Sequence, residues 1–167
     1  MKERIQFVDE NDNPIGAGTR EEAWAKKIHH RMVRVILRDE QGNVLIQKRS
    51  PDKSSYPNLW TDSATGHVDE GETYEQAVNR EMSEEIGVKT VLKGLGKYLT
   101  VESKGGNDVP IFNMSFEGTI TRDTPINMQE SEVSDTRWIA LDELKDMMQE
   151  SPGIFTPGFL ESVRRFY

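Results

Sequence analysis

Apolar and polar residues alternate along this chain with two periods, one typical of strands and one typical of helices. Residues 109–120 alternate with period two, as a strand with one buried face does. Other segments rich in apolar and β-branched residues predict strands at 3–9, in both arms of 30–49, at 88–103 and at 132–141. Runs of Gly, Asn, Asp and Pro separate these segments and predict turns between them.

Helical periodicity marks the remaining segments. Thr19, followed three residues later by Glu22, has the pattern of a capping box and predicts a short helix over residues 20–27. Further helices are predicted from about Thr73 to a C-cap at Gly87, over 141–151 and over 158–167. Strands and helices together predict an α+β fold, in which a mixed sheet is covered by helices.

The length of the chain suits one domain. The sequence contains no internal repeat, linker or low-complexity tract. We therefore expect a single domain over residues 1–167, with residues 1–28 forming an N-terminal hairpin and a short helix. This leader is interpreted either as an edge hairpin or as a lid.

Composition narrows the function classes. The net charge of −8 argues against a nucleic-acid polymer as partner, because phosphate backbones need a basic surface. The absence of cysteine excludes disulfides and thiolate metal sites. No apolar run has the length of a membrane span, and the N-terminus lacks the apolar core of a signal peptide, so we expect a cytoplasmic protein without a membrane partner. Whether it forms a homodimer is left open.

Three glutamates of the helix predicted after Thr73 share one side. At roughly 100° per residue, Glu81, Glu84 and Glu85 fall within an arc of about 100° beside the apolar face. Carboxylates crowded in this way raise one another's pKa values unless a cation neutralises them. Hard oxygen ligands suit Mg²⁺ or Mn²⁺, so the segment is interpreted as a metal platform. The alternative is an acidic, solvated helix with incidental spacing.

The stretch that contains these glutamates resembles a known motif. Residues 66–88, GHVDEGETYEQAVNREMSEEIGV, match the Nudix box, G-x5-E-x7-R-E-U-x-E-E-x-G-U with U an aliphatic residue, position for position. The resemblance implies a Nudix α/β/α sandwich with a mixed sheet. It also implies a strand-loop-helix unit that binds divalent metal and hydrolyses a diphosphate linked to another group.

The motif assigns roles by position. Glu81 and Glu85 correspond to the principal metal ligands, and the carbonyl group of Gly66 is a further candidate ligand. Glu84 corresponds to an additional ligand or the general base. Arg80 corresponds to the arginine of the catalytic motif and is expected to brace the loop and helix through charge-assisted hydrogen bonds.

A second resemblance concerns the flanking sequence. Residues 30–73 are similar to the Nudix subgroup that includes type I isopentenyl-diphosphate isomerase. The position of that family's catalytic cysteine holds Thr65, a far weaker proton donor than a thiol. Ala23 replaces one histidine and Gly106 one acid of the isomerase metal cage, whose matching positions are His30, His67 and Asp108. The scaffold therefore resembles the isomerase, whereas the chemistry resembles hydrolysis.

Five residues are candidates for substrate contact: Arg49, Tyr56, Trp60, His67 and Asp108. Arg49 precedes the loop that leads to the motif and is placed to meet phosphate. Tyr56 and Trp60 either stack on a base or pack under that loop, and packing is favoured for Trp60. His67 is interpreted equally as a substrate contact and as a loop-capping residue.

The leading functional hypothesis is Mg²⁺-dependent hydrolysis, with Mn²⁺ as an alternative ion, of a nucleoside diphosphate linked to a further group. Glu84 is the first candidate for the general base, followed by Glu132 and Asp108. Two alternatives remain: an isopentenyl-diphosphate isomerase and a non-catalytic, nucleotide-binding Nudix module. The sequence does not identify the leaving group.

Overall fold

Strand β3 is the centre of a mixed sheet in the computed structural model, which describes residues 2–167. β3 (His30–Arg38) pairs in parallel with β8 (Asn107–Thr119) over its whole length and antiparallel with β1 (Ile5–Val8), β4 (Val44–Arg49) and β6 (Ala64–His67). Because the β3–β8 pair is parallel and the pairs on either side of it are antiparallel, the sheet is mixed, as predicted.

The remaining strands extend the sheet outward. β2 (Pro14–Gly18) pairs with β1, β7 (Leu92–Lys104) pairs with β8, and β5 (Trp60–Thr61) and β9 (Val133–Ile139) pair with β4. The hairpin predicted between β3 and β4 is paired only at its turn end, at Leu37–Leu45 and Arg38–Val44. Away from the turn the two strands diverge, and β3 pairs with β6 whereas β4 pairs with β9.

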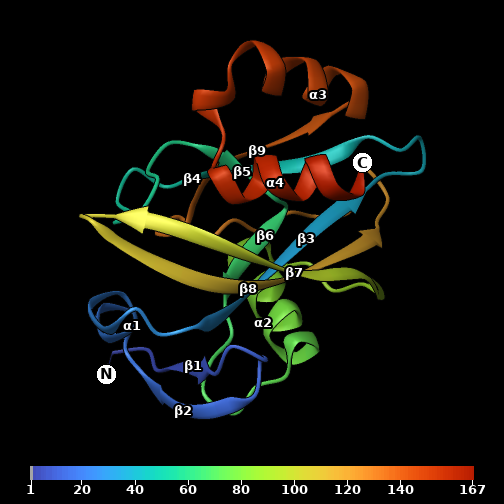
Figure 1. Cartoon of the computed structure of the whole chain (residues 1–167). Coiled ribbons are helices and arrows are strands. Elements are labelled where there is room, and N and C mark those ends of the chain that lie inside the picture. The colour runs from blue at the N-terminus through green and yellow to red at the C-terminus, as the bar shows by residue number, and fades with distance from the viewer. Residues whose placement is uncertain (1) are drawn as a thin grey trace.

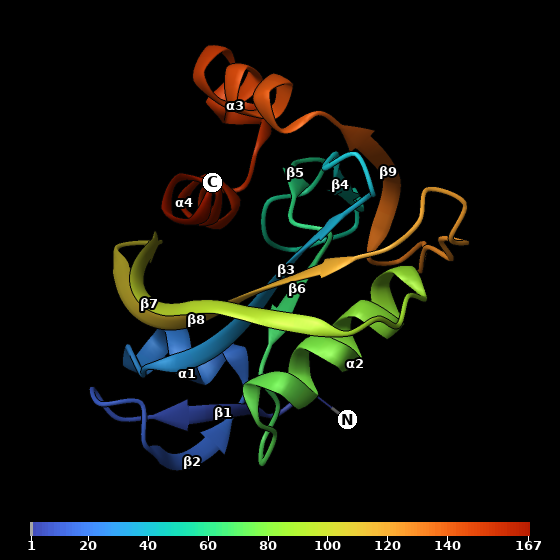
Figure 2. The same cartoon turned by 90° about the vertical axis from the view of Figure 1, so that its right-hand side faces the viewer.

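Helices cover both faces of the sheet (Figures 1 and 2). Val33 and Val35 of β3 pack with α2 (Tyr74–Ile86), whereas Ile36 packs toward the other face. The helices on that face are α3 (Leu141–Glu150) and α4 (Pro157–Phe166), joined by the short 3₁₀ helix η1 (Pro152–Ile154). The predicted α/β/α sandwich is therefore confirmed. None of the helices in the described chain is long and apolar enough to cross a membrane.

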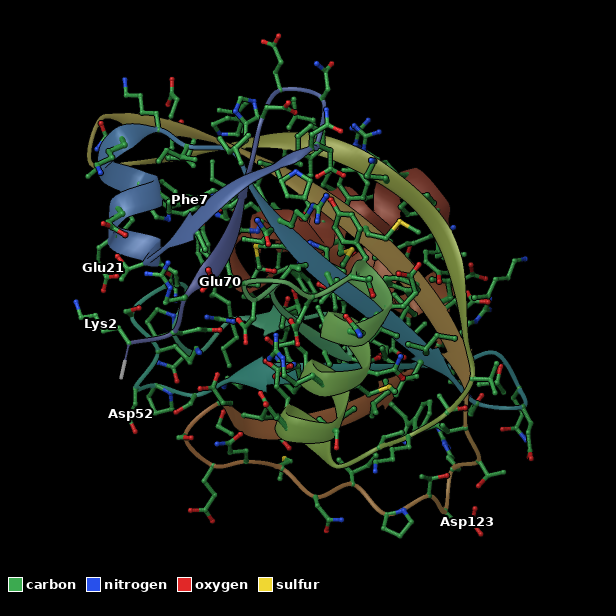
Figure 3. The ribbon with its side chains drawn as sticks, turned by 90° about the horizontal axis from the view of Figure 1, so that it is seen from below. Lys2, Phe7, Glu21, Asp52, Glu70 and Asp123 are labelled. Atoms are coloured by element: carbon green, nitrogen blue, oxygen red, sulfur yellow. The ribbon has the colours of Figure 1, made fainter. Side chains whose placement is uncertain are left out.

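The N-terminal leader continues the sheet as an edge hairpin. Its helix α1 (Arg20–Lys26) begins with the predicted capping box, and Phe7 packs with Ala23 of this helix (Figure 3). The backbone N–H of Gln6 donates to the carbonyl group of Val68 at 2.9 Å, and its side-chain oxygen accepts from the N–H of Gly71. These bonds hold the leader against the loop that precedes α2, which favours the edge-hairpin interpretation over a free lid.

Asp12 fixes the leader to three other elements. Its buried carboxylate accepts hydrogen bonds from Arg31 of β3 at 2.6 Å, Lys97 of β7 at 2.7 Å and the hydroxyl group of Tyr74 at 2.9 Å. Because Tyr74 begins α2, this cluster sets the position of that helix against the sheet.

Candidate functional site

A cavity of about 390 Å³ opens between the leader, β6, α2 and the start of α4. The predicted site residues that line it are Arg49, Tyr56, Gly66, His67, Arg80, Glu81, Glu84 and Glu85. These residues come from four segments of the chain, which the sheet and α2 bring together.

Two predicted substrate contacts lie elsewhere. Trp60 packs against the apolar cluster beneath α3 and α4, with the ammonium group of Lys48 5.9 Å from its ring centroid. Asp108 is exposed near the turn of the β7–β8 hairpin, where Ser103 donates to its carboxylate. Strand alternation explains this, because Val109 points into the core and its neighbour Asp108 therefore points out. The structure does not bring Trp60 or Asp108 to the cavity.

Glu81 and Glu85 are buried and each leaves one oxygen free. Oε2 of Glu85 accepts from the side-chain amide of Gln47 at 2.6 Å and from the backbone N–H of Thr65 at 3.0 Å. Oε1 of Glu81 accepts from Arg80 at 2.8 Å. Within residues 2–167, Oε2 of Glu81 and Oε1 of Glu85 accept no hydrogen bond from the protein. These two oxygens remain for a ligand in the cavity.

Gly66 is required by the close approach of Glu81. A Cβ atom on Gly66 would lie 2.1 Å from the carboxyl carbon of Glu81, well inside van der Waals contact. The absence of a side chain therefore lets the Glu81 carboxylate lie directly against the backbone of β6. This close approach explains why the sequence motif begins with glycine.

Burial makes the charged forms of the two carboxylates costly. Burial raises the pKa of Glu81 to about 8, with repulsion from Glu85 adding to the rise and Arg80 opposing it. Burial raises the pKa of Glu85 to about 7, although its hydrogen bonds from Thr65 and Gln47 oppose the rise. A divalent ion bound to hard oxygens would relieve this cost.

The donor set fits a hard ion that keeps part of its hydration shell. No three histidine, aspartate or glutamate side chains among the described residues already converge as a metal cage. Glu84 is half-exposed and lies 3.3 Å from Arg80. Glu81, Glu85 and the Gly66 carbonyl group would therefore supply part of the shell, and water and substrate oxygens the rest, as Mg²⁺ prefers.

Arg80 braces the loop and the helix, as predicted. Its guanidinium group forms a bidentate pair with Glu72 at 2.7 and 2.9 Å and donates to the carbonyl group of His67 at 3.0 Å. The same side chain reaches Glu81. Arg80 thereby joins the start of the loop, the start of the helix and a candidate metal ligand.

Arg20 and Arg49 are unusual among the arginines of residues 2–167, because every other arginine lies within 4.0 Å of a carboxylate and these two do not. Both line the cavity and both bind Ser55: Arg49 donates to its carbonyl oxygen at 2.8 and 3.0 Å, and Arg20 to its hydroxyl group at 3.3 Å. Burial lowers the pKa of Arg49, although Glu85 opposes this. The pair offers uncompensated positive charge to an anionic ligand.

Sequence reasoning missed Arg20 and Lys53. Arg20 lies in the leader helix and Lys53 in the loop after β4, where it pairs with Glu132. Arg20, Lys53 and Glu132 all line the cavity. Nothing in the local sequence around Arg20 or Lys53 distinguishes them from surface cations, since their convergence depends on the fold.

The two histidines of the isomerase-like pattern stack on each other, with ring centroids 5.4 Å apart. His67 lines the cavity, whereas His30 is fully buried behind it. Burial lowers the pKa of His30 to about 4 and that of His67 well below its ordinary value. Both rings are therefore neutral near pH 7.

The raised pKa values of Glu81 and Glu85 predict that the metal-free protein loses stability as the pH rises. The folded state holds these protons more tightly than the unfolded chain, whose glutamates titrate near 4.5. This contribution is complete below about pH 4.5 and is lost as the pH rises through about 7 and 8. In EDTA, the free energy of unfolding should fall on the order of 2 kcal/mol between about pH 6.5 and 8.5.

Urea denaturation at several pH values measures this change. His30 and His67 act in the opposite direction, because their lowered pKa values add stability as the pH rises to about 7.5 and cause no change above it. The double variant Glu81→Gln/Glu85→Gln retains this histidine contribution and serves as the control, so it should show no fall in stability over the same range. A wild-type profile that, like that of the double variant, shows no fall would contradict the assignment.

Comparison with known proteins shows which family the chain belongs to. A family model described as the NUDIX domain matches residues 28–159. The chain is similar to isopentenyl-diphosphate Delta-isomerase 2 of Photorhabdus laumondii, with 32% identity over 160 residues, covering 95% of this chain and 89% of that protein. It is also similar to the prenyl-diphosphate phosphatase of Methanosarcina mazei, with 33% identity over 166 residues, covering 98% and 94%.

A solved structure agrees with these matches. The crystal structure of DR0079 from Deinococcus radiodurans has a TM-score of 0.80 and 29% identity to this chain, with 99% of each chain covered. The family match, the whole-length relatives and the shared fold lead to one assignment: this chain belongs to the Nudix hydrolase family.

Proposed function

We propose that the protein hydrolyses a diphosphate bond in a small organic molecule with the help of Mg²⁺, for which Mn²⁺ is the expected substitute. One observation supports this most strongly: a single cavity is lined by two buried carboxylates with free oxygens and by two arginines that have no carboxylate partner within residues 2–167. Such a cavity suits a divalent ion and the anion that the ion binds. Membership of a hydrolase family that generally uses divalent metals supports the same conclusion.

The proposed roles follow from the contacts. Glu81, Glu85 and the Gly66 carbonyl group hold the ion, and Arg80 keeps the Glu81 carboxylate in place. When bound, the divalent ion supplies positive charge beside the phosphate oxygens and lowers the pKa of a coordinated water molecule. Arg49, with Arg20 beside it, offsets the charge of the diphosphate and fixes its orientation.

Glu84 is the proposed general base. It lines the cavity and is half-exposed, so a water molecule has access to it. In the proposed step the water oxygen bonds to phosphorus, the bridging P–O bond breaks, and the water proton passes to the carboxylate. Glu132 is the second candidate, since it also lines the cavity, whereas the exposed position of Asp108 outside the cavity lining argues against its use as the base.

Two substrate classes are proposed. The first is a nucleoside diphosphate linked to a further group, because the exposed ring of Tyr56 and the ring of Trp24 line the cavity and offer stacking surfaces. The second is a prenyl diphosphate, because the relative from Methanosarcina mazei is named a prenyl-diphosphate phosphatase and is similar along nearly the whole chain.

Isomerisation is less well supported. The hydroxyl group of Thr65, which stands at the position of the isomerase cysteine, donates to the carbonyl oxygen of Val33 at 2.9 Å. Its backbone N–H donates to Glu85. A hydroxyl group is a weak acid, and here its proton is already engaged within the sheet.

Product identification in ¹⁸O-labelled water tests the proposal. The protein is incubated with Mg²⁺ and a panel of nucleoside diphosphate derivatives, dinucleoside polyphosphates and prenyl diphosphates. The expected result is cleavage with ¹⁸O in a phosphate-containing product, lost in EDTA and restored by Mg²⁺ or Mn²⁺. An isomerised product without a phosphate fragment would support the isomerase instead. Ligand-induced melting shifts without turnover of any substrate would support a binding module.

A further inference from the structure

A buried guanidinium group, that of Arg34, forms part of the cavity wall on the α4 side of the sheet. Its Nε donates to the side-chain oxygen of Asn113 at 3.0 Å and its Nη1 to Asp62 at 2.8 Å. The side chain is only 5% exposed, yet Arg34 lines the cavity. Among the described residues, Nη2 has no hydrogen-bond acceptor, so its two N–H groups remain for a ligand.

Gly158 at the start of α4 makes room for this free nitrogen. A Cβ atom on Gly158 would lie 1.8 Å from Nη2 of Arg34. Gly158 also lines the cavity, and α4 lies over this face of the sheet (Figures 1 and 2). Hydrogen bonds to Asn113 and Asp62 therefore fix the guanidinium group, and the absence of a side chain at Gly158 leaves the space that Nη2 occupies.

An acceptor and an aromatic ring lie near this donor. Glu102, on the inward-facing side of β7, lines the cavity and has no ion-pair partner within residues 2–167. Burial opposes the raised pKa of Arg34, which Asp62 chiefly causes and to which the negative charge of Glu102 adds. Glu102 also adds to the rise that burial causes in the pKa of Tyr56. Tyr56 exposes its ring to the same space.

We propose that Arg34 and Glu102 are specificity-determining residues, which select a substrate whose non-reacting end is a flat polar ring carrying adjacent hydrogen-bond acceptors and donors. Arg34 donates to the acceptor, Glu102 accepts from the donor, and Tyr56 contacts the ring face. An apolar chain in this place would desolvate both charged groups without replacing their hydrogen bonds, which is unfavourable. This inference rests on the proposed function, because it concerns the far end of the same diphosphate substrate.

Affinity for two non-hydrolysable ligands tests the selection independently of turnover. Calorimetry with Mg²⁺ compares a methylene-bridged nucleoside diphosphate with a prenyl methylenediphosphonate, which share the diphosphate mimic and differ at the other end. The wild-type protein should bind the nucleotide roughly 10–100-fold more tightly, since each hydrogen bond to a charged group contributes about 1.5–3 kcal/mol.

Two variants should reduce that preference. Gly158→Ala forces the Arg34 guanidinium group to move, because the added Cβ atom would lie 1.8 Å from Nη2 and 2.8 Å from Nη1, whereas Glu102→Ala removes the acceptor from a partly exposed position. Each should lower nucleotide affinity about tenfold or more and leave prenyl ligand affinity within about threefold. Gly153→Ala is the matched control, because a Cβ atom there meets nothing within 4 Å. Thermal melting confirms that each variant is folded.

The outcomes separate this inference from the proposed function. Equal or tighter binding of the prenyl ligand by the wild-type protein, or an unchanged preference in both folded variants, would overturn the role of Arg34 and Glu102, even if hydrolysis occurs. Retained preference with no hydrolysis of any substrate would overturn the proposed function and leave the selection intact.

Discussion

Replacing Glu85 with glutamine is expected to abolish most hydrolytic activity while leaving the protein folded. Glutamine can still accept the hydrogen bonds from Gln47 and Thr65 through its side-chain oxygen, but it places an amide nitrogen where the free oxygen of Glu85 faces the cavity. Losing an anionic metal ligand removes several kcal/mol of transition-state stabilisation, which corresponds to on the order of 10³-fold in kcat/KM.

Stability provides the second readout of this variant. Because burial raises the pKa of Glu85, the neutral amide should leave the metal-free protein as stable as the wild type, or more stable, above about pH 7. Steady-state kinetics and urea denaturation measure the two effects side by side. Glu130→Gln, at an exposed position that forms no ion pair with any residue the structure describes, is the matched control and should keep full activity. Near-normal turnover by folded Glu85→Gln would contradict the assignment of Glu85 as a metal ligand.

Replacing Gly66 with alanine is expected to damage the same site without changing any charge. The added methyl group would lie 2.1 Å from the carboxyl carbon of Glu81, so the carboxylate must move away from β6 or the strand must shift. A candidate ligand displaced by an ångström or more no longer fits the geometry that Mg²⁺ demands. We expect a loss of at least about 10²-fold in kcat/KM, since small misplacements at a reacting centre have effects of that size.

Direct measurement of metal affinity distinguishes this effect from simple unfolding. Mn²⁺ binding, followed by electron paramagnetic resonance, should weaken in Gly66→Ala at temperatures where circular dichroism shows a folded protein. Gly153→Ala is the comparison, because its Cβ atom enters open space. Unchanged Mn²⁺ affinity in folded Gly66→Ala would show that the Glu81 carboxylate does not depend on this glycine for its position.

Helix α2 illustrates what local sequence predicts well. Its N-cap at Thr73 forms the capping box with Gln76, and its C-cap Gly87 adopts the left-handed conformation. Start, end and buried face all depend on residues within one or two turns, so they were predictable. The brace between Arg80 and Glu72 also lies within this local motif and was predicted from it.

Features that depend on distant parts of the chain were not predictable in this way. The parallel pairing of β3 with β8 joins segments about half the chain apart, and no local pattern encodes it. Arg20 reaches the cavity only because the leader hairpin pairs with β3 and the loop before α2. Trp60 packs against the apolar cluster beneath α3 and α4, which was its favoured interpretation. Asp108 was proposed as a contact from residue type and position, but strand alternation places it at the surface.

Anomalous diffraction from crystals grown with Mn²⁺ and a non-hydrolysable diphosphate analogue tests the central claim most directly. We expect an ion bound by the free oxygens of Glu81 and Glu85 and by the carbonyl oxygen of Gly66, with the diphosphate completing its shell and reaching toward Arg49. An ordered analogue in the cavity with no ion between these two glutamates would contradict it.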